Sequence, residues 1–419
     1  MKTEKLFHEL LGLGMNWEVQ ECEFDHHEGV VRIKVGETRH LWEMERSPGD
    51  GAKVDLYDHT KELVWRHLNV FEHRCEIRCR LPRGKCQKSG KVYRITPPWE
   101  GLSIHFTKAF EAFALLLMRE MPVSAVSRLV KETDTRLWRM LKAHVATAHP
   151  QSDWSNVVCV GCDEMSVRKG HNYITVFCDM IGKKVLFAVK GKAKSVWEAF
   201  ARNLEQHHGH PRQVREVSMD MSPAYIAGVD ENIGSQAEVV FDKFHVVATA
   251  SKAVDETRRT EARQSASARN VLKESRWVWL KNPENLTDKQ KLKFQSLEKE
   301  NLATARAYQM RLNLTEIYSI PNQFLAKKRF MAWCRWVRRV SKQYASLMFA
   351  KMVACAGMIE RHLEGILAYW NRKTTNAFLE GLNSVFSAVK RKARGYRSTD
   401  NLITMLYFTA GKLRIPASH

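Results

Sequence analysis

Short apolar runs separated by turn residues dominate the first hundred positions of this 419-residue chain. Segments 30–35, 62–70 and 74–82 read VVRIKV, ELVWRHLNV and RCEIRCRLP, with the β-branched residues that are typical of strands. Turns rich in Gly, Pro and Lys interrupt these runs. Residues 1–100 are therefore predicted to form a small β-rich module.

In residues 103–148, apolar residues recur with the spacing of an α-helix. Three helices are predicted, with Pro122 near the start of the second and Thr133 as the N-cap of the third. The third helix would present four residues outward: Thr135, Arg136, Arg139 and Lys142. A tight turn before the last of three helices is typical of a helix-turn-helix DNA-binding domain. An ordinary helical bundle with a solvated basic face is the alternative.

Strand and helix patterns alternate in residues 155–247. Three apolar runs are followed by an amphipathic helix, by a strand that ends at Asp220, and by a helix after Pro223. A further strand is predicted over 237–247, carrying Asp242 and His245. Three antiparallel strands, a helix, a strand, a helix and a strand are the order of an α/β fold of the ribonuclease-H-like type.

Residues 248–370 read almost wholly as helices, with a break at Pro283. Five tryptophans lie among their basic residues: Trp277, Trp279, Trp333, Trp336 and Trp370. Aromatic side chains interleaved with basic ones can stack on nucleic acid. Aromatics at helical spacing are more often core residues, and that interpretation is preferred for most of the five.

The last segment, 371–419, predicts a helix that starts at Thr374 or Thr375 and ends near Ala393. Glu380 lies on its polar face, and an apolar stripe is formed by Phe378, Leu382, Val385 and Val389. A basic run follows, which includes Lys390, Arg391, Lys392 and Arg394. These cations would bind phosphates near a site, or would only complement the end of a helix.

Three carboxylates from separate segments of the chain could act together at one site. Asp163 and Asp220 would end neighbouring strands of one sheet, and Glu380 projects from a helix that can pack beside them. Acids at the ends of buried strands need a positive partner. A pair of Mg²⁺ (or Mn²⁺) ions held by such carboxylates supports in-line phosphoryl transfer. The alternative is that all three are ordinary salt-bridging residues.

The net charge of the chain indicates which kind of partner it binds. The chain carries 67 Lys and Arg against 46 Asp and Glu, a formal charge of +21. Such an excess favours a polyanion, and DNA or RNA more than a membrane surface. No apolar stretch has the length of a membrane span or of a signal peptide, so a cytoplasmic location is expected. Nine cysteines, an odd number, predict reduced thiols.

Several long motifs carry a resemblance to a known family. They are GCDEMSVRKGHNYITVFCD, SMDMSPAYIAGV, VVFDKFHVV, LKNPENLT and FLEGLNSVFSAVKRKARGYRSTDNL, in this order over roughly residues 100–410. The chain resembles the transposases of the ISL-three family of bacterial insertion sequences. This resemblance implies an Asp-Asp-Glu catalytic triad on a ribonuclease-H-like fold with a helical insertion. The triad would fall on Asp163, Asp220 and Glu380, with Asp242 and His245 as supporting residues.

The resemblance is partial in the N-terminal module, where the family has a zinc ribbon. Its C-P-x-C-G pair corresponds here to Ser47-Pro48-Gly49-Asp50-Gly51, and its C-P-x-H-G-like end corresponds to Cys86-Gln87-Lys88-Ser89-Gly90. One ligand position, Cys86, is kept. The module is therefore predicted to hold its shape without zinc or with a weak site, and the thiols of Cys75 and Cys79 to be unliganded.

The expected function is that of a DNA transposase, which binds the terminal inverted repeats of its element and cleaves and joins strands with metal ions. Synapsis of two ends implies a homo-oligomer on double-stranded DNA. A non-catalytic DNA-binding protein derived from a transposase is one rival interpretation. A structure-selective nuclease on the same fold is another.

Overall fold

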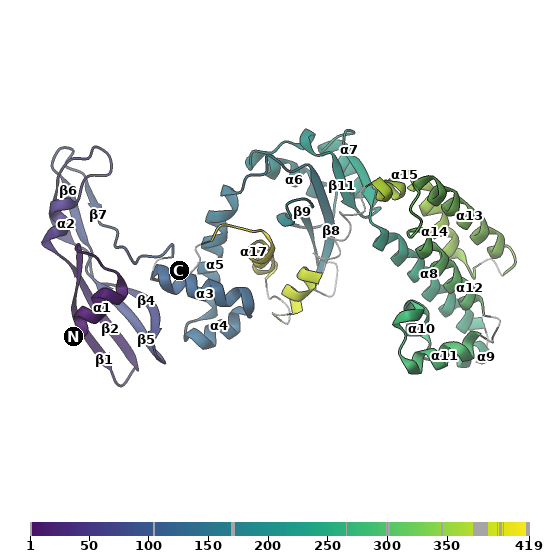
Figure 1. Ribbon diagram of the computed structural model, residues 1–419, viewed down its shortest axis with the longest axis horizontal. Helices are drawn as coiled ribbons and strands as arrows, with labels where there is room; N and C mark the ends of the chain where they lie inside the picture. The colour runs from purple at the N-terminus through teal and green to yellow at the C-terminus, as the bar shows by residue number, and fades with distance from the viewer. Residues whose placement is uncertain are drawn as a thin grey trace. The chain divides into compact units, whose positions relative to one another are not determined.

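A computed structural model of the chain describes residues 2–103, 105–168, 172–264, 266–298, 300, 302–344, 347–371, 384–391, 393, 396 and 398–415 (Figure 1). The chain divides into two units, Met1–Ser152 with Ala388–His419, and Asp153–Ser387. Both helices and sheets are present, so the fold is mixed α/β. In the described part of the chain, no helix is long and apolar enough to cross a membrane.

The first unit begins with a β-rich module. Its elements are α1 (Thr3–Leu11), β1 (Trp17–Asp25), β2 (Val30–Glu37), α2 (Arg39–Met44), β3 (Val54–His59), β4 (Leu63–Val70), β5 (His73–Cys79), β6 (Pro82–Cys86) and β7 (Val92–Arg94). One sheet has the order β1-β2-β5-β4 and a second has the order β3-β6-β7. The three predicted strands are confirmed as β2, β4 and β5, although β5 ends at Cys79. Buried Trp17, Ile33, Trp65 and Ile77 form the core of the module.

Two similar turns bring together the four positions at which a zinc ribbon would carry its ligands. Cys86 Sγ lies 3.6 Å from both carboxylate oxygens of Asp50 and accepts the Ser89 backbone N–H at 3.4 Å. Hydrogen bonds from Ser89, and also from Ser47, hold the pKa of the Cys86 thiol below its ordinary value. These positions offer one thiol, one carboxylate and two hydroxyls, which is a poor donor set for zinc. Burial raises the pKa of the Cys75 and Cys79 thiols to about 12, so neither is a ready ligand.

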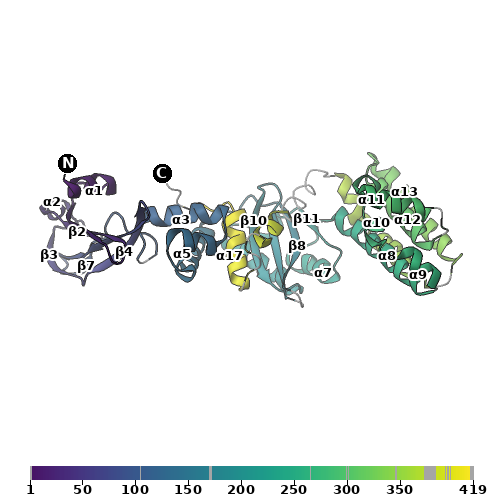
Figure 2. The ribbon, with the colours of Figure 1, turned by 90° about the horizontal axis from the view of Figure 1, so that it is seen from below.

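Three helices follow the module: α3 (Lys108–Glu120), α4 (Val123–Val130) and α5 (Asp134–Ala148), with a short 3-10 turn, η1 (His149–Gln151). Thr133 caps α5 as predicted, because its side chain accepts the Arg136 N–H. Inside the bundle, Glu111 and His144 lie 2.9 Å apart and are both buried. The C-terminal helix α17 (Thr399–Ala410) lies beside α5 (Figure 2). Arg119 places its guanidinium 5.4 Å from the ring centre of Phe408 in α17.

The second unit is built around a five-stranded sheet. Its elements are β8 (Cys159–Arg168), β9 (Asn172–Asp179), β10 (Lys184–Lys190), α6 (Ser195–Gln206), η2 (Pro211–Gln213), β11 (Glu216–Met219), α7 (Pro223–Asn232) and β12 (Glu238–Phe241). The strand order is β10-β9-β8-β11-β12. The pairs β10/β9 and β9/β8 are antiparallel, whereas β8/β11 and β11/β12 are parallel. This is the predicted order of elements. Val196, Phe200 and Leu204 of α6 are buried, which agrees with the predicted amphipathic helix.

The strand that was predicted over 237–247 is wrong beyond Phe241. Asp242 Oδ1 accepts the Phe244 N–H at 3.0 Å, and the chain turns there into a helix. Residues from Lys243 onward form α8 (Lys243–Gln264), so His245 lies in a first helical turn and not in a strand. An aspartate that accepts a nearby N–H is a common way to start a helix.

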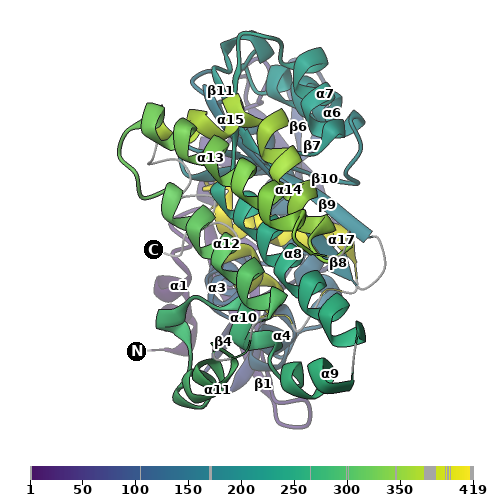
Figure 3. The ribbon, with the colours of Figure 1, turned by 90° about the vertical axis from the view of Figure 1, so that its right-hand side faces the viewer.

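Beyond β12, the part of the second unit that the structure describes up to Asn371 is built of helices and connecting turns. Its elements are α8, α9 (Ala266–Leu272), α10 (Arg276–Leu280), η3 (Pro283–Asn285), α11 (Asp288–Glu298), α12 (Ala303–Ile317), α13 (Gln323–Ser341), α14 (Ala350–Arg361), α15 (Leu363–Leu367) and η4 (Ala368–Asn371). The break predicted at Pro283 is confirmed. Helices α8, α12, α13 and α14 lie side by side (Figure 3).

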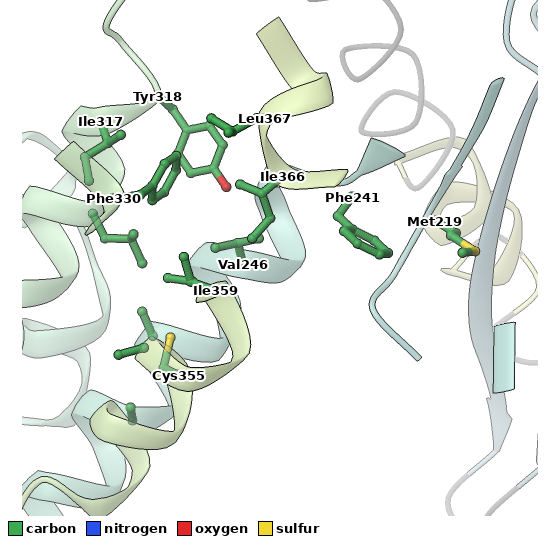
Figure 4. Close-up of a cluster of buried hydrophobic side chains, with 14 of the residues drawn as sticks. Met219, Phe241, Val246, Ile317, Tyr318, Phe330, Cys355, Ile359, Ile366 and Leu367 are labelled. Carbon is green, nitrogen blue, oxygen red and sulfur yellow. The ribbon is translucent and has the colours of Figure 1, made fainter. Parts of the chain in front are cut away.

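One apolar cluster joins the sheet to these helices. Phe241 and Met219 contribute from the strands, whereas Val246, Ile359 and Ile366 contribute from α8, α14 and α15 (Figure 4). Four of the five tryptophans are fully or partly buried: Trp279, Trp333, Trp336 and Trp370. The core interpretation of most of the tryptophans is therefore confirmed.

Candidate active site

The strand register places three aspartates at one level of the sheet. Ser218 pairs with Gly161 across β11 and β8, and Met219 pairs with Phe241 across β11 and β12. Continuing both registers by one or two residues sets Asp220 between Asp163 and Asp242. Neighbouring strands lie about 4.8 Å apart, and residues in register project to the same face. Asp220 directly follows the end of β11 as predicted. The prediction that Asp163 ends its strand is wrong, because Asp163 lies within the adjacent strand β8, which continues to Arg168.

Asp163 is held by its own backbone and approached by a histidine. Its Oδ1 accepts the Glu164 N–H at 2.7 Å, and the same oxygen lies 3.7 Å from His245 Nε2. The Asp163 side chain is 17% exposed, so a substrate or a cation can reach it. His245 was expected to accompany Asp242, and the structure places its ring nitrogen beside Asp163.

Asp220 and Asp242 each start a helix in the same way. Asp220 Oδ1 accepts the Ser222 N–H at 2.9 Å, just before α7, as Asp242 does before α8. Their surroundings differ. Asp220 is partly exposed, whereas Asp242 is buried. Burial raises the pKa of Tyr318 well above its ordinary value, and the charge of Asp242 adds to the effect, so this carboxylate faces the helical part of the unit.

The charges of Asp163 and Asp220 both act on one buried thiol. Burial raises the pKa of the Cys162 thiol, and the charges of Asp163 and Asp220 raise it further. Two negative charges that lie close together attract a cation between them. Carboxylate oxygens are the ligands that Mg²⁺ prefers.

Glu164 forms a second polar cluster that the sequence did not predict. Its carboxylate lies 4.0 Å from Lys192 Nζ, and Tyr225 donates a hydrogen bond to it. Burial raises the pKa of Glu164, and the charges of Asp220 and Asp163 also raise it, whereas Lys192 and Tyr225 lower it. Lys192 lies after β10 and carries no motif, so no signal in the sequence marks it.

The predicted DNA-reading face of α5 is only partly open. Thr135, Arg139 and Lys142 are exposed. Arg136 is instead engaged within the unit, because its Nη1 lies 2.7 Å from Glu132 and its guanidinium lies 4.6 Å from the ring centre of Phe106. Arg139 and Lys142 line a groove of about 760 Å³, which Trp138 and Tyr396 also border.

Comparisons with known proteins decide the family. A family model described as "Transposase" matches residues 160–406, and one described as "Helix-turn-helix domain of transposase family ISL3" matches residues 105–145. The chain belongs to the ISL3 family of transposases. The helix-turn-helix prediction is thereby confirmed, and a domain of this kind implies binding to DNA.

Named relatives agree with the ISL3 assignment. The transposase for insertion sequence element IS1001 of Bordetella parapertussis is 28% identical over 354 residues, which cover 84% of this chain and 85% of the relative. The transposase for insertion sequence element IS1557 of Mycobacterium tuberculosis is 25% identical over 457 residues, which cover 100% of this chain and 98% of the relative.

The third predicted acid of this ISL3 transposase, Glu380, lies outside the described residues, as do Lys392 and Arg394. Transposases of this kind generally use divalent metal ions. Within the described ranges, no group of three or more His, Cys, Asp or Glu side chains could hold a metal ion. Residues 384–391 are helical, with Phe386 and Val389 buried. Val385, which was expected in the apolar stripe, is exposed.

Proposed function

We propose that this chain binds the terminal inverted repeats of an insertion sequence and catalyses metal-dependent DNA cleavage and strand transfer. The observation that carries the proposal is the parallel register of β11 and β8, which sets Asp220, directly after β11, beside Asp163 in β8, in a chain whose family is that of transposases. The relatives are named as transposases for insertion sequence elements, which supports the choice of substrate.

The catalytic core is proposed to be ribonuclease-H-like. The strand order β10-β9-β8-β11-β12, with an antiparallel part followed by a parallel part, supports this assignment. Helices α8–α15 would then be the insertion between the second and the third catalytic acid. Ligands in such sheets lie beyond the carboxyl ends of parallel strands, where Asp220 and Asp242 are found.

Asp163, Asp220 and Glu380 would hold two Mg²⁺ or Mn²⁺ ions. Bound there, the ions would activate the attacking oxygen, first of water and then of a DNA 3′-hydroxyl, and stabilise the leaving oxygen. Asp163 and Asp220 are preferred to Asp242 because they are partly exposed, whereas Asp242 is buried. His245 would orient Asp163, and Asp242 would support the turn into α8.

DNA would be held by two basic regions. Arg139 and Lys142 on the open part of α5 would contact the element end, and Arg136 would hold the start of α5 through Glu132. Lys390, Arg391, Lys392 and Arg394 would bind phosphates, which position DNA but carry little sequence information. Bringing two ends together implies a homo-oligomer on double-stranded DNA.

The test is an Asp163→Asn variant assayed with oligonucleotides that carry the element ends, with Mg²⁺ or Mn²⁺. Joined products are expected from the unmodified protein and are expected to fall by roughly a hundredfold or more in the variant. Asp153→Asn removes an exposed aspartate of the same unit and serves as the matched control. If the unmodified protein binds ends but never cleaves them, it is a non-catalytic DNA-binding protein. Cleavage without joining would instead indicate a nuclease.

A further inference from the structure

One of the five tryptophans of the helical region is not part of the core. Trp277, in the short helix α10, is 58% exposed, whereas Trp279 two residues later is buried. A single exposed aromatic is common on protein surfaces and indicates nothing by itself. The surroundings of Trp277 are what distinguish it. The guanidinium of Arg276 lies 5.2 Å from the centre of its ring.

Arg276 also belongs to a cluster of arginines around one buried aspartate. Asp255 of α8 accepts Arg258 Nη2 at 2.7 Å and Arg259 Nη2 at 2.9 Å, and Arg276 Nε lies 3.3 Å away. The Asp255 side chain is only 9% exposed. Because these contacts hold the guanidinium groups in place, little side-chain entropy remains to be lost when an anion binds.

The arginine cluster has donors to spare for a ligand. Three guanidinium groups carry about fifteen N–H donors, whereas one carboxylate offers about four acceptor sites. Asp255, Arg259 and Arg276 line a pocket of about 340 Å³, together with Lys252, Glu256, Ser251 and Leu280. With Arg258, four cationic side chains face two carboxylates here, so the site has an excess of positive charge. Planar, fixed guanidinium groups match the oxygens of a phosphate.

We propose that this part of α8 and α10 binds an unpaired nucleotide of DNA. Arg259 and Arg276 would contact its phosphate in the pocket, and its base would stack on Trp277. An exposed ring beside fixed cations is the combination by which proteins bind single strands without reading their sequence. Bases in a duplex are already stacked and cannot cover the ring in this way. The choice of DNA as the ligand rests on the proposed function.

The test measures binding of the full-length protein to a fluorescent single-stranded thymidine oligomer and to a duplex of the same length. Trp277→Ala is expected to weaken single-strand binding by about fivefold to a hundredfold, with duplex binding nearly unchanged. Trp277→Phe keeps an aromatic face and should restore most of the affinity. Arg276→Gln should reduce the salt dependence of single-strand binding by about one unit of slope.

Phe324→Ala is the matched control. Phe324 is 62% exposed on α13 of the same unit and has Lys328 Nζ 4.4 Å from its ring centre, but it lacks the arginine pocket. Unchanged single-strand binding by Trp277→Ala would overturn the proposal, as would equal losses for single strand and duplex. If the unmodified protein joins element ends while Trp277→Ala binds single strands normally, this site is refuted and the proposed function stands. Loss of single-strand binding in Trp277→Ala, in a protein that joins no ends, would support the site and refute the function.

Discussion

His245 Nε2 lies 3.7 Å from Asp163 Oδ1, so the first turn of α8 reaches the carboxylate in the middle of β8. A histidine in this position can hold the carboxylate in one rotamer. The helical part of the second unit thereby takes part in arranging the sheet edge.

Replacing His245 by Ala should lower the rate of strand joining by about tenfold to a hundredfold, the usual cost of losing a group that orients a metal-binding carboxylate. The loss should shrink as Mg²⁺ or Mn²⁺ is raised, because the defect would lie in cation affinity. Rates measured over a metal titration check this. A loss that stays constant at every metal concentration would contradict the orienting role.

Glu164→Gln should change the pH dependence of stability. Because the pKa of Glu164 is raised in the folded protein, the protonated side chain stabilises the folded wild type at low pH. This contribution to the free energy of unfolding is lost as the pH rises above about 4.5, the ordinary pKa of a glutamate. A neutral glutamine does not lose it. The melting temperature of Glu164→Gln relative to wild type should therefore increase from pH 4.5 to pH 7, as thermal unfolding in a buffer series can show. Parallel profiles for the two proteins would exclude this effect.

Glu111→Ala should destabilise the first unit. The buried Glu111 carboxylate accepts the N–H groups of Leu102 and Ser103 at 2.8 and 2.7 Å and faces His144 at 2.9 Å. Removing it leaves the buried His144 ring and two partly buried N–H groups without their acceptor, and breaking a buried pair of this kind costs about 3–5 kcal/mol. Urea denaturation of the variant measures the change in the free energy of unfolding. As a control, Glu120→Ala removes an exposed glutamate from the same helix and should cost little.

Chelators should leave the N-terminal module folded. Hydrogen bonds among Ser47, Asp50, Cys86 and Ser89 occupy the positions at which a zinc ribbon has its ligands. Excess EDTA is therefore expected to leave the melting temperature unchanged. A variant that combines Ser47→Cys, Asp50→Cys and Ser89→Cys should bind about one zinc ion per chain, since four thiolates then converge. Stoichiometric zinc in the purified wild type, or unfolding by EDTA, would refute this prediction.

The parts of the fold that follow from local pattern were predictable. The runs of β-branched residues predicted β2 and β4, and the spacing of apolar residues in α6 predicted which face of that helix is buried. Both predictions succeed because apolar residues recur at the positions that face the core. The end of β12 was missed because FDKFHVV has strand-like composition. The Asp242 carboxylate ends the strand by accepting an N–H, which only three-dimensional structure shows.

The candidate site was predictable only in part. Asp163 and Asp220 were chosen as acids at strand ends, which are costly without a partner, but only Asp220 lies at the end of a strand, since β8 continues past Asp163 to Arg168. The approach of His245 to Asp163, and that of Lys192 to Glu164, join residues 82 and 28 positions apart in the chain. No local pattern records such pairs. The sequence also could not show which arginine of α5 is exposed, because Arg136 and Arg139 differ only in their tertiary neighbours.

The first unit contains both Met1–Ser152 and Ala388–His419, so its helix-turn-helix is completed by the last part of the chain. Because α17 packs against α5, a ribosome must synthesise the whole second unit before the first can close. At about 5–20 residues per second, the interval between Ser152 and Ala388 lasts about 12–50 seconds. During translation, the nascent chain would carry an unfinished helix-turn-helix unit, whereas the five-stranded sheet of the second unit can already form. A premature stop codon before residue 388 would therefore leave the first unit, which contains the N-terminal part of the chain, incomplete.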